Sequence, residues 1–322
     1  MTQRAVVTGG AGFIGSHLAD RLLAEGWDVH VVDDLSNGHR HNVPADASFH
    51  ELDVSDVNAL LVLAESIGPV DRWFHLAAQA DVRVSVADPV HDARVNVIGT
   101  INVLQAAALH EAPVLLASTG GAIYGAAPLP TPETAPARPE SPYGAAKRAA
   151  EEYLAQDARL NGGRHAVVRY ANVYGPRQDP HGEGGVVAIF GGRALAGTAA
   201  RIFGDGTQTR DFVYVGDVVD ATIAASDAAA SGSDEDLRAG GDLPIYNVGT
   251  AVETTVLDLW ASMERTVGRE LGIEFADARP GELDRSALDA SRARTRLRVG
   301  IDTSIDEGVA ATLEWLGSRV EA

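Results

Sequence analysis

The sequence predicts an α/β protein in which a doubly wound parallel sheet is followed by a smaller C-terminal α/β lobe. Three observations predict it. Short apolar runs of strand length alternate with segments of helical spacing from Arg4 to Tyr170, a glycine-rich turn joins the first run to the first helix, and the alternation ends after Tyr170. Repeated strand–helix units place helices on both faces of a parallel sheet. We therefore assign residues 1–170 to the main domain and residues 171–322 mainly to a second lobe, with some segments returning to the main sheet.

The first unit has the pattern of a dinucleotide-binding turn. Arg4–Thr8 is a predicted strand, Gly9-Gly-Ala-Gly-Phe-Ile-Gly15 is the turn, and residues 16–25 have helical spacing. A second strand, residues 28–32, leads into Asp33, which lies 18 positions after Gly15. The glycines let a pyrophosphate approach the helix N-terminus, and a carboxylate at about this spacing binds the ribose 2′-hydroxyl. A carboxylate there would repel a 2′-phosphate, so the sequence predicts a Rossmann-type fold that binds NAD rather than NADP.

The alternation continues through the rest of the main domain. Predicted strands cover residues 48–52, 70–76, 113–118 and 165–170, and predicted helices cover 56–67 (capped by Ser55), 89–110 and 143–160. The carboxyl ends of parallel strands meet at one edge of the sheet, where cofactors bind. The residues at these predicted ends are therefore candidates for the site: Asp33, Asp53, Ala77, Ser118 and Tyr170.

The C-terminal part is less regular. Predicted helices lie near residues 186–196, from 217, at 256–267 and at 304–316, and predicted strands lie near 201–203, 211–215, 244–248 and 273–275. Residues 227–242 are rich in small and acidic residues, which predicts an exposed loop. This irregularity does not suit a second dinucleotide-binding half, so we predict a substrate-binding lobe.

Tyr143 and Lys147 are the predicted catalytic pair. They stand four residues apart in Ser-Pro-Tyr-Gly-Ala-Ala-Lys, at the start of a predicted helix, and Lys147 is the only lysine of the chain. Residues four apart share one helical face, so the phenol and the ammonium can face the same pocket. A nearby cation favours the phenolate. The pair predicts a tyrosine general base with a lowered pKa.

The composition of the 322-residue chain excludes several classes of protein. Without cysteine there is neither a disulfide nor thiolate chemistry. A net charge of −19 argues against nucleic acid and anionic membranes as partners. No apolar run approaches the roughly 20 residues of a membrane span, and the chain begins directly with a predicted strand rather than a signal peptide, so we expect a cytoplasmic protein. The histidines show no spacing typical of a metal site, and we predict none.

The motifs together resemble the extended short-chain dehydrogenase/reductase family, in its branch that acts on sugar nucleotides. The resemblance covers nearly the whole chain. It is carried by the glycine turn, Asp33-Asp-Leu-Ser-Asn-Gly, His75-Leu-Ala-Ala-Gln, Asn96-Val-Ile-Gly-Thr, Ser118-Thr-Gly-Gly-Ala-Ile-Tyr-Gly, the Tyr143/Lys147 stretch, Arg169-Tyr-Ala-Asn-Val-Tyr-Gly-Pro-Arg, Gly206-Thr-Gln-Thr-Arg-Asp-Phe-Val-Tyr-Val and Arg279-Pro-Gly-Glu. It implies an NAD-dependent epimerase that inverts C4 of a UDP-sugar through a transient 4-keto sugar.

The resemblance also implies roles for single residues. Tyr143 takes the proton of the sugar 4-hydroxyl, and Lys147 binds the nicotinamide ribose and lowers the tyrosine pKa. The implied cofactor-binding residues are Gly9, Gly12, Phe13, Ile14, Asp33, Asn37, Asp53, Val54, Leu76, Ala77, Ala78, Asn96, Ser118, Tyr143, Lys147 and Tyr170. The implied substrate-binding residues are Thr119, Tyr143, Asn172, Val186, Phe203, Arg210, Arg279, Glu282 and Ser286. Among them Asn172, Arg210 and Arg279 hold the diphosphate and Glu282 a ribose hydroxyl.

Two positions depart from the family pattern. Many relatives have a serine or threonine four residues before the tyrosine that matches Tyr124, and this chain has Gly120 there. We assign its role of assisting Tyr143 to Thr119, with Ser118 as the alternative. Ser286 stands where some epimerases have a bulky tyrosine, so we hypothesise that the pocket also admits a 2-acetamido sugar.

Several alternatives stay open at this point. A sugar-nucleotide dehydratase or decarboxylase would need acids just before Tyr124, where the chain has Gly120, Gly121 and Ala122. An epimerase acting on UDP-glucuronate or at another carbon is a closer rival, and a non-catalytic NAD-binding regulator is a rival of another class. The resemblance further implies a homodimer through helices 89–110 and 143–160, with burial inside the monomer as the alternative.

Overall fold

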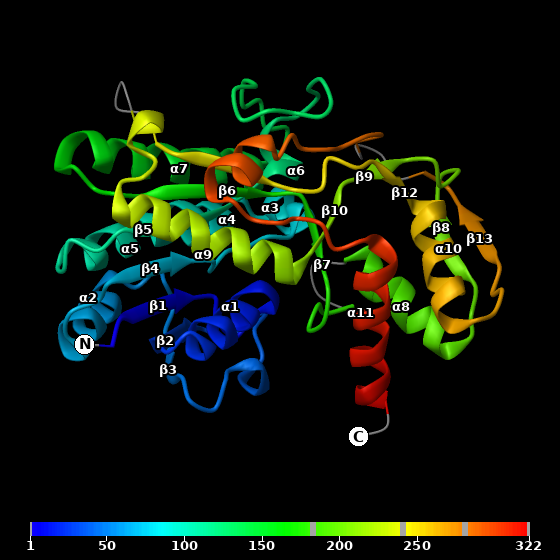
Figure 1. Ribbon diagram of the computed structural model, residues 1–322, viewed down its shortest axis with the longest axis horizontal. Coiled ribbons are helices and arrows are strands. Elements are labelled where there is room, and N and C mark those ends of the chain that lie inside the picture. The colour runs from blue at the N-terminus through cyan, green and yellow to red at the C-terminus, as the bar shows by residue number, and fades with distance from the viewer. Residues whose placement is uncertain (1, 181–184, 239–242, 279–282, 321–322) are drawn as a thin grey trace.

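A seven-stranded parallel sheet forms the centre of the protein (Figure 1). The computed structural model describes residues 2–180, 185–238, 243–278 and 283–320. The strands lie in the order β11-β6-β5-β4-β1-β2-β3. Their bounds are β1 (Arg4–Thr8), β2 (Asp28–Asp33), β3 (Ser48–Glu51), β4 (Arg72–His75), β5 (Val114–Thr119), β6 (Ala166–Tyr170) and β11 (Ile245–Val248). The order reverses at β1, which pairs with β2 on one side and with β4 on the other. The predicted doubly wound fold is therefore confirmed, and a ligand crevice is expected beyond the ends of β1 and β4.

Helices cover both faces of this sheet. Helices α1 (Phe13–Ala24) and α9 (Val215–Ser231) bury Leu18, Leu22 and Val218 against one face. Helices α2 (Val57–Ile67), α5 (Gly99–Ala108) and α7 (Pro142–Asn161) bury Leu60, Val103 and Leu154 against the other. Successive strand residues alternate between the two cores, as Val6 and Val7 of β1 do, because a strand has a period of two.

The predicted helix 89–110 is interrupted. It consists of α4 (Pro89–Ala93), a π-helical turn (Arg94–Ile98) and α5, and it is preceded by α3 (Val82–Ala87), which the sequence reading missed. A single π turn inside an α-helix frequently marks a functional site. The cap of α2 was also assigned wrongly, because Asp56 accepts from the Ala59 N–H, whereas Ser55 bonds to Asp53.

The second lobe has its own core. Helices α8 (Val186–Ala196), α10 (Val256–Val267) and α11 (Ile305–Val320) pack around Phe190, Trp260 and Leu313, beside strands β8 (Ala200–Phe203) and β13 (Ile273–Ala276). Two further strand pairs form separate small sheets after residue 170: β7 (Asn172–Tyr174) with β10 (Phe212–Tyr214), and β9 (Thr209–Arg210) with β12 (Thr254–Thr255). In Figure 1 the lobe lies to the right of the sheet.

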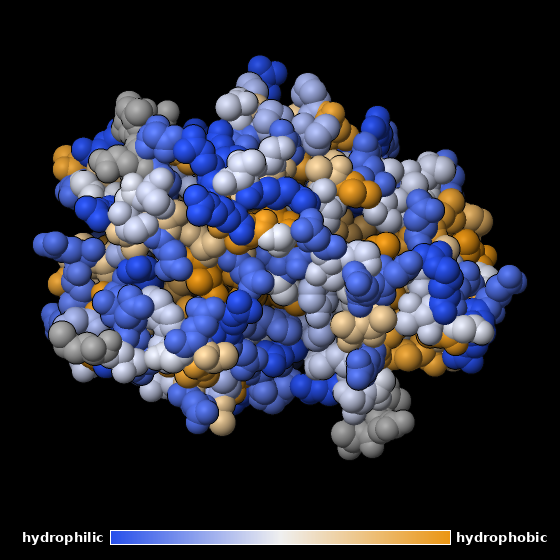
Figure 2. Space-filling model, in the orientation of Figure 1, coloured by the Kyte–Doolittle hydropathy of each residue, from blue (hydrophilic) through white to orange (hydrophobic). Residues whose placement is uncertain are grey.

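The prediction of an exposed loop over residues 227–242 is wrong for part of that segment. Helix α9 continues to Ser231 because Ala225 and Ala229 pack into the sheet core, and a 3₁₀ turn covers Glu235–Arg238. Asp234 is buried and accepts a hydrogen bond from Tyr246. Figure 2 shows hydrophilic side chains over most of the face turned to the viewer. No helix of the described ranges is both long and apolar enough to cross a bilayer.

Candidate active site at the carboxyl ends of the sheet

The turn between β1 and α1 requires glycine. Gly9 has φ +72°, and a Cβ there would lie 2.6 Å from the Ala77 nitrogen, while a Cβ on Gly15 would overlap the Gly9 carbonyl oxygen. Gly12 is the N-cap of α1 and provides no side chain to bond the first helical N–H groups. These N–H groups and the helix dipole thus face outward as an anion site, which fits the pyrophosphate of a dinucleotide.

Asp33 lies at the end of the neighbouring strand and faces this turn. Its two carboxylate oxygens accept from the main-chain N–H groups of Leu35 and Ala11, both at 2.9 Å. Burial raises the pKa of Asp33, and these two hydrogen bonds oppose the rise. A Cβ on Gly38 would lie 2.7 Å from Oδ1, so glycine gives the carboxylate its space. A carboxylate fixed in this way suits a ribose hydroxyl.

His75 ends β4 and links two parts of the site. On one side of the ring, His75 Nδ1 lies 2.8 Å from Thr8 Oγ1, which accepts from the Ala77 N–H at 3.2 Å. On the other side, His75 Nε2 lies 3.0 Å from Thr100 Oγ1, which donates to the Asn96 carbonyl. Since the Thr100 hydroxyl donates to Asn96, it accepts from Nε2–H, and Thr8 donates to Nδ1. Burial, together with the charge of Lys147, lowers the pKa of His75 to about 3, so the ring is neutral.

Asn96 lies on the π turn and is surrounded by polar groups that the sequence reading missed. Its Nδ2 donates to the Gln79 carbonyl at 2.8 Å and to Asp92 Oδ1 at 3.0 Å. Gln79 Nε2 donates to the same Asp92 oxygen. Within the described residues, Asn96 Oδ1 and Asp92 Oδ2 are buried without a hydrogen-bond partner, which is costly unless a ligand or water satisfies them. The only sequence signal was the i, i+4 spacing of Asp92 and Asn96.

The predicted catalytic pair lies at the start of α7. Ser141 caps the helix by accepting from the Gly144 N–H, and Pro142 occupies its first turn. Tyr143 is half-buried, whereas Lys147 is buried and donates from Nζ to the Ala117 carbonyl of β5 at 3.0 Å. Gly144 packs so closely on the Ala122 carbonyl that a Cβ would overlap it. The pair is thereby held beside the loop that follows β5.

That loop distinguishes the two candidate hydroxyls. Ser118 donates to Glu151 Oε1 at 2.7 Å, so its proton is already used. Thr119 Oγ1 accepts from the Ala122 N–H at 3.2 Å and caps the short helix α6 (Gly120–Ile123), which the sequence reading did not predict. An accepting hydroxyl keeps its own proton for a second partner. This geometry favours Thr119 over Ser118, although its role remains a prediction.

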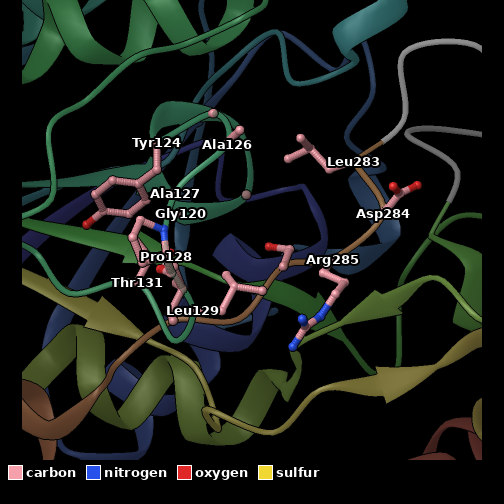
Figure 3. A pocket seen from close by; sticks show the side chains of 14 residues that line it. Gly120, Tyr124, Ala126, Ala127, Pro128, Leu129, Thr131, Leu283, Asp284 and Arg285 are labelled. Carbon is pink, nitrogen blue, oxygen red and sulfur yellow. The ribbon is translucent and has the colours of Figure 1, made fainter.

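A pocket of about 640 Å³ opens beside this loop (Figure 3). Gly120, Gly121 and Ser286 are among the residues that line it, and Figure 3 shows Leu283, Asp284 and Arg285 across from Tyr124. The departure at Gly120 has a steric reason, because a Cβ there would overlap the side chain of Leu288. Arg285 donates from Nε and Nη2 to Glu253, at 2.8 and 2.5 Å.

The other predicted cofactor residues surround the crevice with different exposure. Half-buried ones are Gly9, Gly12, Phe13, Ile14, Leu76, Ala77 and Ala78; buried ones are Asp33, Val54, Asn96, Ser118, Lys147 and Tyr170; Asn37 and Asp53 are exposed. Tyr170 directs its hydroxyl to Thr222 on α9, 2.7 Å away. Any contact of Tyr170 with a cofactor therefore comes from its ring or main chain.

The predicted substrate residues come from the second lobe and its connections. Phe203 ends β8, Arg210 ends β9 and Val186 begins α8, all half-buried, and Asn172 begins β7 exposed. The Thr209 N–H donates to the Asp284 carbonyl at 2.9 Å, which joins the Arg210 strand to the pocket wall that carries Ser286. Arg279 and Glu282 lie outside the described residues.

A glycine turn at an uncapped helix, a fixed carboxylate beside it and a Tyr–Lys pair on one helix are the features of an NAD-dependent enzyme. The family model described as the NAD dependent epimerase/dehydratase family matches residues 5–249, and the chain belongs to this family. NAD is its cofactor, as the sequence predicted.

The relatives narrow the class. A UDP-glucose 4-epimerase of Mycolicibacterium smegmatis is 44% identical over 98% of this chain and 99% of that protein. The solved UDP-glucose 4-epimerase of Thermotoga maritima with UDP-glucose has a TM-score of 0.91 at 41% identity, covering 99% of this chain and all of that one. The enzyme of Thermus thermophilus in complex with NAD has a TM-score of 0.86 at 39% identity, covering 98% and 99%.

Proposed function

We propose that this protein is a UDP-glucose 4-epimerase, which interconverts UDP-glucose and UDP-galactose and serves galactose metabolism. The observation that carries the proposal is the Tyr143–Lys147 pair, one turn apart on α7 and fixed to the end of β5 beside the dinucleotide turn. The high identity to UDP-glucose 4-epimerases over the whole chain supports it.

In the proposed reaction, Tyr143 accepts the proton of the sugar 4-hydroxyl and later returns it. Lys147 holds its charge beside the phenol and reaches the nicotinamide ribose. Thr119 donates its free hydroxyl proton to the reacting oxygen. NAD would be held by the glycine turn, Asp33 and Lys147, and when bound it would supply the hydride chemistry at C4. Asn172, Arg210 and Arg279 bind the diphosphate, because guanidinium groups match phosphate oxygens.

The pocket residues disfavour the rival reactions. Dehydration needs an acid to protonate the leaving hydroxyl, and Gly120, Gly121 and Ala122 offer no side-chain proton. A uronate needs a cation for its carboxylate. Of the described lining residues Arg285 is the cation, and Glu253 already accepts from it twice. Ser286 has a small side chain where some epimerases have a bulky tyrosine, which leaves room for a 2-acetamido group. We therefore extend the proposed substrates to UDP-N-acetylhexosamines.

We further propose a homodimer formed through the 89–110 and 143–160 helices. Apolar side chains are exposed there, including Val90 (69%), Ile98, Tyr153 and Leu160. Exposed apolar side chains on neighbouring helices are typical of an interface. Val90→Glu is expected to shift the protein to monomer in light scattering, whereas Val62→Glu on α2 is the control. We also propose a cytoplasmic location, since a chain without cysteine needs no oxidising compartment.

The test of the activity is an incubation of the purified protein with UDP-galactose, UDP-glucuronate and UDP-N-acetylglucosamine without added NAD. We expect UDP-glucose from the first, no product from the second, and UDP-N-acetylgalactosamine from the third. Turnover of UDP-glucuronate alone would replace the proposed substrate, and no turnover of any sugar with NAD still bound would favour a regulatory protein.

A further inference from the structure

Helix α7 presents a third polar residue on the face that carries the catalytic pair. Glu151 follows Lys147 by four positions and Tyr143 by eight, so all three lie on one side of the helix. The Glu151 side chain is 1% exposed, yet both of its oxygens are satisfied. Oε1 accepts from Ser118 (2.7 Å) and Arg169 Nε (2.8 Å), and Oε2 accepts from Arg169 Nη2 (2.5 Å) and Arg148 (3.3 Å).

Arg169 extends the contact across the sheet. It lies on β6 with 2% of its side chain exposed, and its Nη1 donates to the Tyr124 hydroxyl at 2.8 Å. Tyr124 donates onward to Asn247 Oδ1 on β11 at 2.8 Å, and Asn247 Nδ2 donates to the carbonyls of Thr131 (2.9 Å) and Asp289 (3.3 Å). Burial raises the pKa of Tyr124, which keeps the phenol neutral and able to donate.

The buried polar chain Glu151–Arg169–Tyr124–Asn247 therefore contacts both ends of the segment that carries Thr119. Glu151 binds Ser118, near the carboxyl end of β5, and Arg169 binds Tyr124, directly after α6. Thr119, Gly120 and Gly121 lie between these two fixed points. Beyond Asn247 the chain reaches Thr131, which lines the pocket, and Asp289, which directly follows the lining residue Leu288.

Stability alone does not explain an ion pair at this position. A buried pair gains little over apolar side chains of the same volume, because both charges lose their hydration. Glu151 also stands one turn from Lys147, where an unmatched carboxylate would attract the ammonium. Arg169 donates to both carboxylate oxygens and neutralises them, which preserves the charge of Lys147 for Tyr143.

We propose that Glu151 and Arg169 are positioning residues of the reaction, which fix the catalytic loop 118–124 against α7 and keep the Lys147 ammonium directed at Tyr143. This inference rests on the proposed epimerase function. Neither residue touches the substrate, and they act through Ser118, Tyr124 and Lys147.

The test compares four variants of the NAD-bound protein. Glu151→Leu combined with Arg169→Met removes both charges and is expected to fold, with kcat lowered roughly tenfold to a hundredfold and KM for UDP-galactose unchanged, because misplaced catalytic groups cost rate rather than binding. Arg169→Met alone leaves Glu151 unmatched beside Lys147 and is expected to be slower still, with the acid limb of the kcat–pH profile moved to higher pH. Arg169→Lys, which still pairs with Glu151, is expected to restore that limb. Glu152→Gln, an exposed neighbour paired with Arg159, is the control and keeps wild-type kinetics.

Wild-type kcat and pH profile in the folded double variant would overturn the proposal. If that variant does not fold, Tyr124→Phe carries the test, since it removes only the link from Arg169 to Asn247 and is expected to lower kcat about threefold to tenfold without changing KM. Wild-type kcat in Tyr124→Phe would then overturn it. If the wild-type protein turns over no sugar, the proposed function fails instead, and amide hydrogen exchange, compared between the variants and the wild type, decides the positioning role. Faster exchange in the variants, confined to residues 119–124 and the first turn of α7, supports this role. Unchanged exchange refutes it.

Discussion

Lys147 and Ala117 are joined between helix α7 and strand β5, because the buried Nζ of Lys147 donates to the Ala117 carbonyl at 3.0 Å. This bond fixes the ammonium one helical turn after Tyr143. An arginine could not reproduce it, since the planar guanidinium is wider and the lysine is only 3% exposed. The one lysine of an otherwise arginine-rich chain thus stands where a compact cation is required.

Tyr143→Phe tests the base directly. Removing the hydroxyl leaves the ring packing but no group to accept the sugar proton, so kcat is expected to fall by roughly 10²–10⁴-fold. The cofactor is expected to remain bound, which absorbance of the purified variant after denaturation measures. Tyr153→Phe, on the exposed side of the same helix, is the control. Near-normal turnover by the Tyr143 variant would end the proposed mechanism.

Gly144→Ala tests the contact between α7 and the loop after β5. The new Cβ would overlap the Ala122 carbonyl and lie 2.9 Å from Pro139 Cβ, and main chain cannot move away cheaply. We expect a loss of about 1–3 kcal/mol in the free energy of unfolding, as for other overpacked sites. We also expect a lower kcat, because Tyr143 moves away from Thr119. Ala145→Ser, at the exposed neighbouring position, provides the comparison in denaturant titrations and steady-state kinetics.

His75→Gln tests the burial of a neutral imidazole. The folded pKa of His75 is about 3 and the unfolded value about 6.5. Above pH 6.5 the ring is neutral in both states. Below it the unfolded chain binds a proton that the folded one does not, so stability falls by about 1.4 kcal/mol per pH unit down to about pH 3. Urea titrations between pH 7 and 5 measure how the free energy of unfolding depends on pH. In the variant this free energy is expected to fall less steeply than in the wild type, by a slope that corresponds to at most one proton. An identical slope in the two proteins would mean that His75 titrates normally in the fold.

Ser286→Tyr tests the open pocket wall. A phenol at this position would fill part of the pocket of about 640 Å³ that Ser286 lines. Turnover of UDP-N-acetylglucosamine is expected to fall at least about tenfold relative to UDP-galactose, because a clash discriminates more than a missing contact. Product analysis with the two substrates in competition measures this ratio. If both activities decline equally, the 2-substituent does not occupy this wall.

The parts of the site that the sequence predicted are those encoded locally. The glycine turn, Asp33 and the Tyr143–Lys147 spacing are each set by a few neighbouring residues, and the sheet follows from the alternation of strands and helices. The polar chain was not predicted, although a charged residue within the apolar strand at Arg169 hinted at a buried partner. Tyr124 and Asn247 are 123 positions apart, and only the folded sheet brings them together.

Asp211→Asn tests how the segment that carries Arg210, the proposed diphosphate ligand, is fixed to the pocket. The buried Asp211 carboxylate accepts from the Thr250 N–H and hydroxyl, at 2.8 and 2.7 Å, and from the N–H groups of Ala251 and Leu288, both at 3.1 Å. An amide presents its NH₂ to some of these donors, so a loss of about 1–3 kcal/mol in stability is expected.

The kinetic effect separates this variant from those that disturb the base. Arg210 directly precedes Asp211, and Leu288 packs on Gly120, so both the phosphate contact and the pocket wall should loosen. We expect KM for UDP-galactose to rise severalfold and kcat to change less. Diphosphate binding would be weakened equally in the ground state and in the transition state, which raises KM but leaves kcat nearly unchanged. Asp205→Asn, a fully exposed turn residue bonded to Thr207, is the control. A fall in kcat at unchanged KM would instead mean that Asp211 acts on the catalytic loop through Leu288 and Gly120. The segment that carries Arg210 would then be fixed by other contacts.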